Sequence, residues 1–211
     1  MCIDAKTSMQ TFLIGGISGV LLSKYKKYKY LSVLVISIAF MQLAEYFMWI
    51  DINCKNNLNK LGNIIGIFSL TAQMLHVAIA NKKLAKIDIV TILLMTMLFI
   101  RYIYNKLPCS IESHYKHLRW GLLKNANNKI ENYLFVGYYL YAILFIRSKI
   151  INKNDKFLSI TLILYLFLLI YSINIPGANI YDVNTWGSFW CYISNIVGPI
   201  LLIKEWISQY L

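Results

Sequence analysis

The sequence has 211 residues, of which 58% are hydrophobic and 14% are charged. A soluble domain is about 45–50% apolar and about 25% charged, so this composition excludes an ordinary soluble domain and a disordered chain, and it indicates an integral membrane protein. The formal net charge is +12. We attribute this charge to loops that face anionic lipid and expect no nucleic-acid partner, because no basic stretch adjoins a soluble aromatic surface.

Seven apolar stretches are candidates for membrane-spanning helices, since about 18 or more such residues cross a bilayer. The first is short and contains three glycines. It could instead be a signal peptide, but its positive charges follow the apolar run, which favours a retained helix. The sequence therefore predicts an all-α integral membrane protein, a single polytopic domain over residues 1–211 with a bundle of about seven transmembrane helices. In chain order the stretches are Met9–Ser23, Tyr30–Ile50, Leu61–Ala80, Ile87–Tyr104, Tyr133–Phe145, Phe157–Ile175 and Trp186–Ile207.

Basic residues gather in alternate connections between these stretches. By the positive-inside rule, that alternation predicts an N-terminus outside and a C-terminus in the cytoplasm. The fourth connection, residues 105–132, is the exception, and it is long enough to form a small cap on the outer side. The basic connections hold Lys24, Lys26, Lys27 and Lys29, then Lys82, Lys83 and Lys86, then Arg147, Lys149, Lys153 and Lys156.

Two cysteines, Cys54 and Cys109, lie on the predicted outer side. An extracytoplasmic compartment permits disulfides, so the two could be bridged, which would tie the cap to the ends of the second and third stretches. Two free thiols are the alternative, and the sequence alone leaves both open.

The cap also contains the segment SIESHYKHLRWG, in which Glu112 precedes His114 and His117. A His-x-x-His pair with a nearby acid could ligate zinc. The alternative is an exposed polar loop whose Tyr115 and Trp120 lie at the level of the lipid headgroups, where aromatic residues are enriched.

Polar residues inside the predicted spans are costly in lipid and usually face the interior of the protein. Gln42 and Glu45 are three residues apart on one helical face, and Trp49 continues that face. His76 falls at the opposite depth and is not expected to reach Glu45. We expect these residues to meet polar and aromatic residues of the last span, namely Trp190, Cys191, Ser194 and Asn195.

These side chains suggest an outward-facing polar pocket that binds a small or lipid-like ligand, with Glu45 as its charge. The alternative is a hydrogen-bond network that holds the helices together. The first function predicted is ligand binding or transport; the others are a membrane-embedded lipid-modifying enzyme and a structural envelope or assembly protein. Nucleotide-binding, serine-hydrolase and zinc-protease motifs do not occur, and no cofactor is expected.

The segments MQLAEYFMWIDINC and WGSFWCYISN resemble sequences in uncharacterised multi-pass membrane proteins of large DNA viruses. The resemblance covers these two short segments and agrees with the Lys, Asn and Ile bias of the chain. It implies a multi-pass viral membrane protein, but it brings no reaction or ligand with it.

Overall fold

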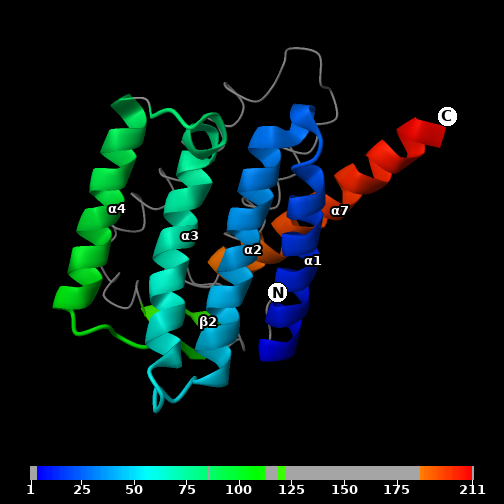
Figure 1. Cartoon of the computed structure of the whole chain (residues 1–211). Coiled ribbons are helices and arrows are strands. Elements are labelled where there is room, and N and C mark those ends of the chain that lie inside the picture. The colour runs from blue at the N-terminus through cyan, green and yellow to red at the C-terminus, as the bar shows by residue number, and fades with distance from the viewer. Residues whose placement is uncertain (1–3, 85, 113–117, 122–185, 211) are drawn as a thin grey trace.

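The computed structural model describes residues 4–84, 86–112, 118–121 and 186–210. Four helices form one layer, in which successive helices run antiparallel and lie side by side (Figure 1). They are α1 (Ala5–Leu22), α2 (Lys29–Ile50), α3 (Leu58–Asn81) and α4 (Lys86–Tyr104), with a short 3₁₀ turn, η1 (Lys26–Tyr28), before α2.

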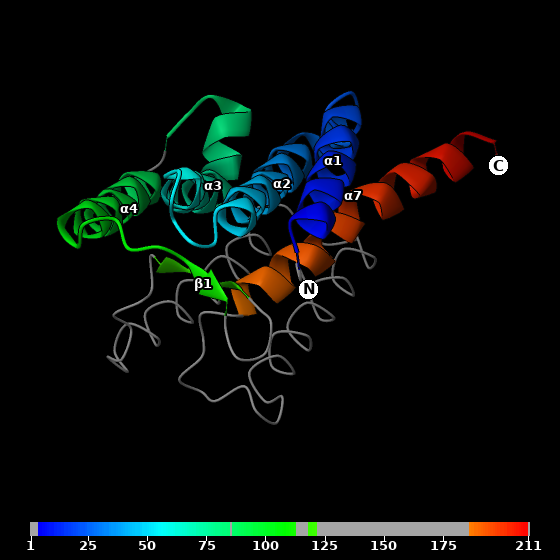
Figure 2. The same cartoon turned by 90° about the horizontal axis from the view of Figure 1, so that it is seen from below.

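A fifth helix and a small hairpin lie on one side of this layer (Figure 2). The helix α7 (Trp186–Tyr210) packs against α1 and α2. The hairpin pairs β1 (Ile111–Glu112) with β2 (Leu118–Arg119) in antiparallel register, and β2 contacts α2. We use "the hairpin" for residues 108–112 and 118–121.

The prediction of a seven-helix transmembrane bundle is wrong. The described residues contain five α-helices, and one helical segment, Lys26–Ile50, is long and apolar enough to cross a membrane. Polar residues interrupt the apolar sequence of two of the other helices: α3 contains Asn59, Asn63 and His76, and α4 carries Lys86 and Asp88. The predicted spans at 133–145 and 157–175 lie outside the described residues.

The helix positions themselves were predicted well. Four apolar stretches, at 9–23, 30–50, 61–80 and 87–104, coincide with α1 to α4, and the last stretch coincides with α7. The length of an apolar stretch therefore located the helices, but it overstated the number of helices that are apolar enough to cross a membrane.

Glycines set how closely α2 and α3 approach. A Cβ atom on Gly62 would lie 2.5 Å from the carbonyl oxygen of Ala44 and 2.8 Å from the Met48 side chain. One turn later, a Cβ on Gly66 would lie 2.6 Å from the ring of Trp120 in the hairpin. Gly62 and Gly66 form the small-x-x-x-small spacing that allows helix backbones to pack closely.

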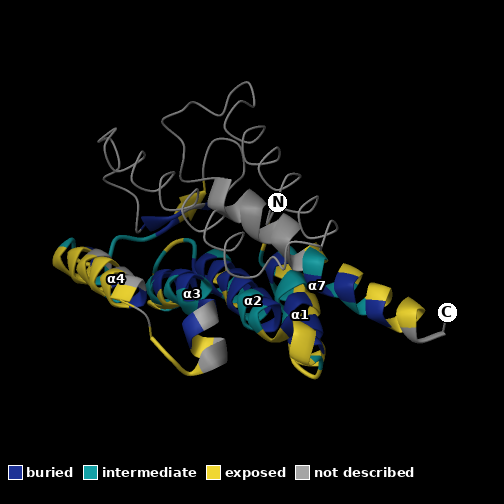
Figure 3. Ribbon diagram, turned by 90° about the horizontal axis from the view of Figure 1, so that it is seen from above, coloured by how far each residue is buried: buried dark blue, intermediate teal, exposed yellow. Residues whose placement is uncertain are grey.

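The outer faces of the helices are apolar. Figure 3 shows that much of α4 is exposed, while α2 and α3 are largely buried. Most of the exposed residues of α4 are large and aliphatic, in contrast to the polar outer face of a helix in a soluble protein. They include Ile89, Val90, Leu93, Leu94, Met97, Ile100 and Ile103.

The antiparallel order gives the layer two chemically different ends. The connections α1–α2 and α3–α4 lie together and contain Lys24, Lys26, Lys27 and Lys29, then Lys82, Lys83 and Lys86. We call this the basic end. The other end holds the α2–α3 connection and the hairpin, and we call it the disulfide end for the bond described below.

Candidate functional site

Glu45 is completely buried, and its carboxylate joins α2 to the hairpin. The indole Nε1 of Trp120 donates to Glu45 Oε1 at 3.3 Å, and Gln42 Nε2 donates to Glu45 Oε2 at 3.5 Å. The hydroxyl of Thr11 on α1 donates to Gln42 Oε1 at 2.8 Å. These four residues, the Glu45 network, link α1, α2 and the hairpin through one continuous set of hydrogen bonds.

Helix geometry explains why two of these residues meet. Gln42 and Glu45 are three positions apart on α2, so their side chains leave the same face. Both are inaccessible to solvent, and Trp120 is 4% exposed. A buried polar side chain costs free energy unless it finds a partner, and here the partners come from neighbouring elements.

A second group of polar contacts fixes the hairpin to α3. The side-chain amide of Asn59 pairs with the backbone of Ser110: Asn59 Nδ2 donates to the Ser110 carbonyl oxygen at 2.9 Å, and Ser110 N donates to Asn59 Oδ1 at 2.7 Å. The Ser110 hydroxyl accepts from Asn63 Nδ2 at 2.9 Å and from Gly121 N at 2.8 Å. All these polar groups are buried, so we call Asn59, Asn63 and Ser110 the Ser110 network.

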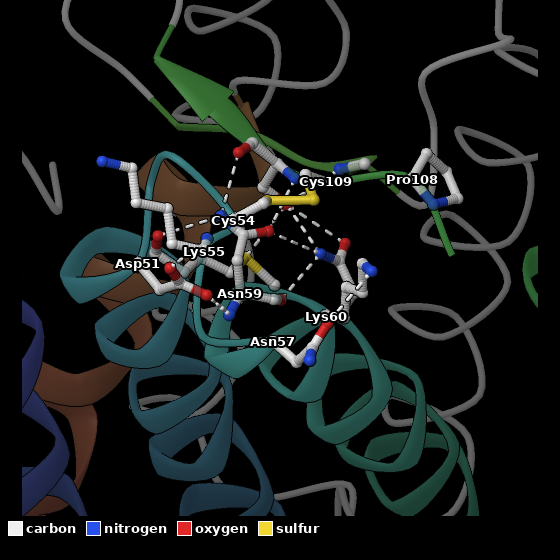
Figure 4. Close-up of a disulfide and its surroundings, with 12 residues drawn as sticks. Asp51, Cys54, Lys55, Asn57, Asn59, Lys60, Pro108 and Cys109 are labelled. Carbon is white, nitrogen blue, oxygen red and sulfur yellow. Dashed lines mark hydrogen bonds between the residues drawn. A yellow bond between two sulfur atoms is a disulfide. The ribbon is translucent and has the colours of Figure 1, made fainter. Parts of the chain in front are cut away.

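Cys54 and Cys109 form a disulfide, with Cα atoms 6.3 Å apart (Figure 4). The bond joins the α2–α3 connection to the start of the hairpin, across 55 residues of sequence. The bridged alternative left open by the sequence is therefore confirmed. Three contacts therefore attach the hairpin to the helices: the disulfide, the Ser110 network and the hydrogen bond from Trp120 to Glu45.

Asp51 organises the turn that carries Cys54. Its Oδ1 accepts from the backbone N–H groups of Lys55 and Asn56, and its Oδ2 accepts from that of Asn59 in the first turn of α3 (Figure 4). Burial alone would raise the pKa of Asp51, but these backbone donors outweigh burial and hold the pKa below its usual value. The charged carboxylate thus stabilises the connection.

The other sequence-predicted residues divide into two groups. Trp49 is half-buried on α2, on the same face as Glu45. Trp190, Cys191, Ser194 and Asn195 lie within α7 as predicted, but their side chains lie outside the described part of the structure. His114 and His117 of the proposed zinc pair also lie outside the described residues.

His76 does not join Glu45, as its depth in α3 predicted. Its Nδ1 lies 2.6 Å from the backbone oxygen of Gln73, one turn earlier. Since that oxygen can only accept, Nδ1 carries the proton when the ring is neutral, and Nε2 is then an acceptor. Among the described residues, His76 Nε2 and Gln73 Nε2 are the buried side-chain nitrogens without a hydrogen-bond partner.

Sequence reasoning missed Thr11, Asn59, Ser110 and the anchoring role of Trp120. The spacing of Gly62 and Gly66 was the available signal, since it marks a helix face open to close contact. Comparisons with protein-family models, curated proteins and solved structures found no match.

Proposed function

We propose that this chain is a multi-pass membrane protein in a structural or assembly role, which holds a disulfide-bonded hairpin in a fixed position at the non-cytoplasmic face. The observation that carries this proposal is the triple attachment of the hairpin at the end opposite the lysine-rich connections. A hairpin held covalently and by two buried networks offers a preformed contact surface, which loses little conformational freedom on binding a partner.

Helix lengths and exposed surfaces support the membrane assignment. The five helices have 18 to 25 residues, which at about 1.5 Å per residue is comparable to a hydrocarbon core of about 30 Å. Soluble monomers rarely expose contiguous large apolar faces such as that of α4. Lipid is the solvent that fits these faces.

Two independent features support one orientation. The α1–α2 and α3–α4 connections carry four and three lysines, whereas the α2–α3 connection has Lys55 and, in the first turn of α3, Lys60. The positive-inside rule therefore favours a cytoplasmic basic end. Disulfides persist in oxidising compartments, so the bond also favours a disulfide end outside the cytoplasm.

The geometry of the Glu45 network favours a structural role over an open binding pocket. Gln42 and Glu45 are fully buried, and the Trp120 ring lies against Gly66 directly beside them. Hydrogen bonds between elements are typical of the polar contacts that hold membrane helices together. In this arrangement Trp120 occupies the place where a ligand of Glu45 would lie.

Ligand binding at Glu45 remains a second candidate, because one observation favours it. Burying a carboxylate in an apolar helix layer costs more free energy than burying an amide of the same shape. A glutamine at position 45 would therefore serve a purely structural contact at a lower cost in free energy. A small or lipid-like ligand would have to displace the Trp120 indole. The lining by Trp190, Cys191, Ser194 and Asn195, the lipid-modifying activity and the viral resemblance stay predictions.

Thermal stability separates these two functions. We would purify wild type, Glu45→Gln and Trp120→Phe in detergent and measure Tm with a panel of lipids and small polar metabolites, with Lys83→Gln as an exposed control. The structural role predicts a lower Tm for the first two variants and no ligand-dependent shift. A compound that stabilises wild type but not Glu45→Gln would instead establish ligand binding, since a ligand of the native state raises its stability by mass action.

Orientation is tested by labelling intact cells with a membrane-impermeant maleimide. We expect Lys6→Cys, at the disulfide end, to gain label over the parent protein, and Lys83→Cys, at the basic end, to gain label only after permeabilisation. The reverse pattern would overturn the orientation. Release of the protein by alkaline carbonate would overturn the membrane assignment itself.

A further inference from the structure

A shallow apolar groove of about 330 Å³ lies on the exposed face of α1. Its volume is at the lower end of the range for ligand sites, roughly 300–1,000 Å³. The middle of the groove is open, because a Cβ atom placed on Gly16 would meet no atom within 4 Å. The groove is lined by Phe12, Leu13, Gly16, Ile17, Val20 and Leu21.

Positive charge begins one turn beyond the end of this groove. Lys24 and Lys26 follow Leu21 and are both exposed, and residues 23–30 contain no acidic side chain. Lys27 is already engaged, because its Nζ lies 2.6 Å from Glu205 Oε2 and 5.2 Å from the ring centre of Tyr28. Lys24 and Lys26 therefore provide exposed cationic groups close in sequence to the end of the apolar groove.

We propose that α1 and the start of the α1–α2 connection bind one anionic phospholipid. An acyl chain lies along the groove over Gly16, and the phosphate headgroup binds Lys24 and Lys26. The apolar lining excludes a polar ligand from the groove, and the adjacent cations select a negative headgroup from among amphiphiles. The inference rests on the proposed membrane orientation, which puts these lysines at the cytoplasmic leaflet, where anionic lipids are found.

The test compares lipid binding by the full-length chain and three variants in neutral detergent, using native mass spectrometry with phosphatidylglycerol and phosphatidylcholine. Gly16→Leu fills the groove, and its side chain has open space to enter. Lys24→Gln/Lys26→Gln removes the headgroup site. Lys82→Gln/Lys83→Gln is the matched control, since it removes the same charge from the other connection of the basic end.

We expect one phosphatidylglycerol to remain bound to wild type and to the control in preference to phosphatidylcholine. The affinity for phosphatidylglycerol should fall roughly thirtyfold in Lys24→Gln/Lys26→Gln, as expected for the loss of two lysines near a lipid headgroup. Gly16→Leu should weaken both lipids, because it removes space for the acyl chain. Tm measured for each variant separates loss of binding from loss of folding.

Three results would overturn the inference. Equal loss in the Lys82 and Lys83 control would mean nonspecific attraction to a charged surface. Unchanged binding in a folded Gly16→Leu variant would remove the groove from the site, and full competition by free inorganic phosphate would mean an anion site without a lipid. Carbonate extraction distinguishes the two proposals: a membrane-retained protein without anionic selectivity defeats this inference alone, whereas a released protein defeats the proposed function.

Discussion

Asp51 connects the stability of the disulfide end to pH. Its pKa in the folded protein is below the usual value, so the charged form favours folding. The contribution is complete above the unfolded pKa of about 3.9 and is lost as pH falls below that value through the folded pKa. Wild type should therefore lose stability below about pH 4.

The variant Asp51→Asn isolates this contribution. It keeps an oxygen acceptor but removes the charge, so its Tm should be lower at pH 6 and should fall less between pH 6 and pH 3 than the Tm of wild type. The carboxylate of Asp4, whose pKa is also lowered by its contact with Thr7, is common to both proteins and cancels in the comparison. Parallel pH curves would contradict the assignment.

Two glycines should respond to alanine in opposite directions. Gly62→Ala places a Cβ against the Ala44 carbonyl and the Met48 side chain, so it should destabilise by about 1–3 kcal/mol through overpacking. Gly16→Ala meets open space and gains helix propensity, so it should stabilise by about 0.5–1 kcal/mol. The difference in free energy of unfolding between the two variants, measured in one detergent, checks both; similar effects would contradict the packing seen between α2 and α3.

At the scale of elements, α7 is held to the basic end by a small polar cluster. Glu205 Oε1 accepts from the Tyr28 hydroxyl at 2.6 Å, and Glu205 Oε2 pairs with Lys27. The apolar side chains of Leu22, Leu31, Val35 and Leu201 pack beside this cluster. Helix α7 thus combines apolar burial with one buried hydrogen bond to the η1 turn.

We expect Tyr28→Phe to cost more than Lys27→Gln. The Tyr28 hydroxyl bonds to a buried carboxylate, and such bonds contribute about 1.5–3 kcal/mol. The Lys27 side chain is 59% exposed, so solvent screens its ion pair, which should contribute less than about 1 kcal/mol. Chemical denaturation of the two variants gives the order, and the reverse order would show that the ion pair dominates.

The sequence predicted where the helices lie, but it did not predict how the hairpin attaches to them. Apolar stretches located five helices because the pattern within one segment is enough to define a helix. The hydrogen bond between Trp120 and Glu45 joins residues that are 75 positions apart in the sequence, and the hydrogen bonds between Asn59 and Ser110 join residues that are 51 positions apart. No local pattern encodes such pairs. The interpretation of the cap as an exposed polar loop, with Trp120 at the level of the lipid headgroups, is therefore wrong for Trp120, which is buried in the protein.

At the scale of the whole molecule, the disulfide should be a major source of stability. The bond closes a loop with a sequence separation of 55 residues, for which the chain-entropy model gives about 4 kcal/mol. The double variant Cys54→Ser/Cys109→Ser should therefore melt well below wild type. Reduction of wild type should lower its Tm to nearly that of the variant, and a variant that melts like oxidised wild type would contradict the prediction.

The same bond makes α3 and α4 part of a covalent ring that starts at Cys54 and ends at Cys109. A protease that cuts once inside this ring, for example at the exposed Lys82 or Lys83, breaks the backbone without releasing either piece. The nicked chain should migrate as one species on a non-reducing gel and as two after reduction. A cut at the basic end is thus held together from the opposite end of the helices, so the protein can keep its helices assembled after such a cleavage.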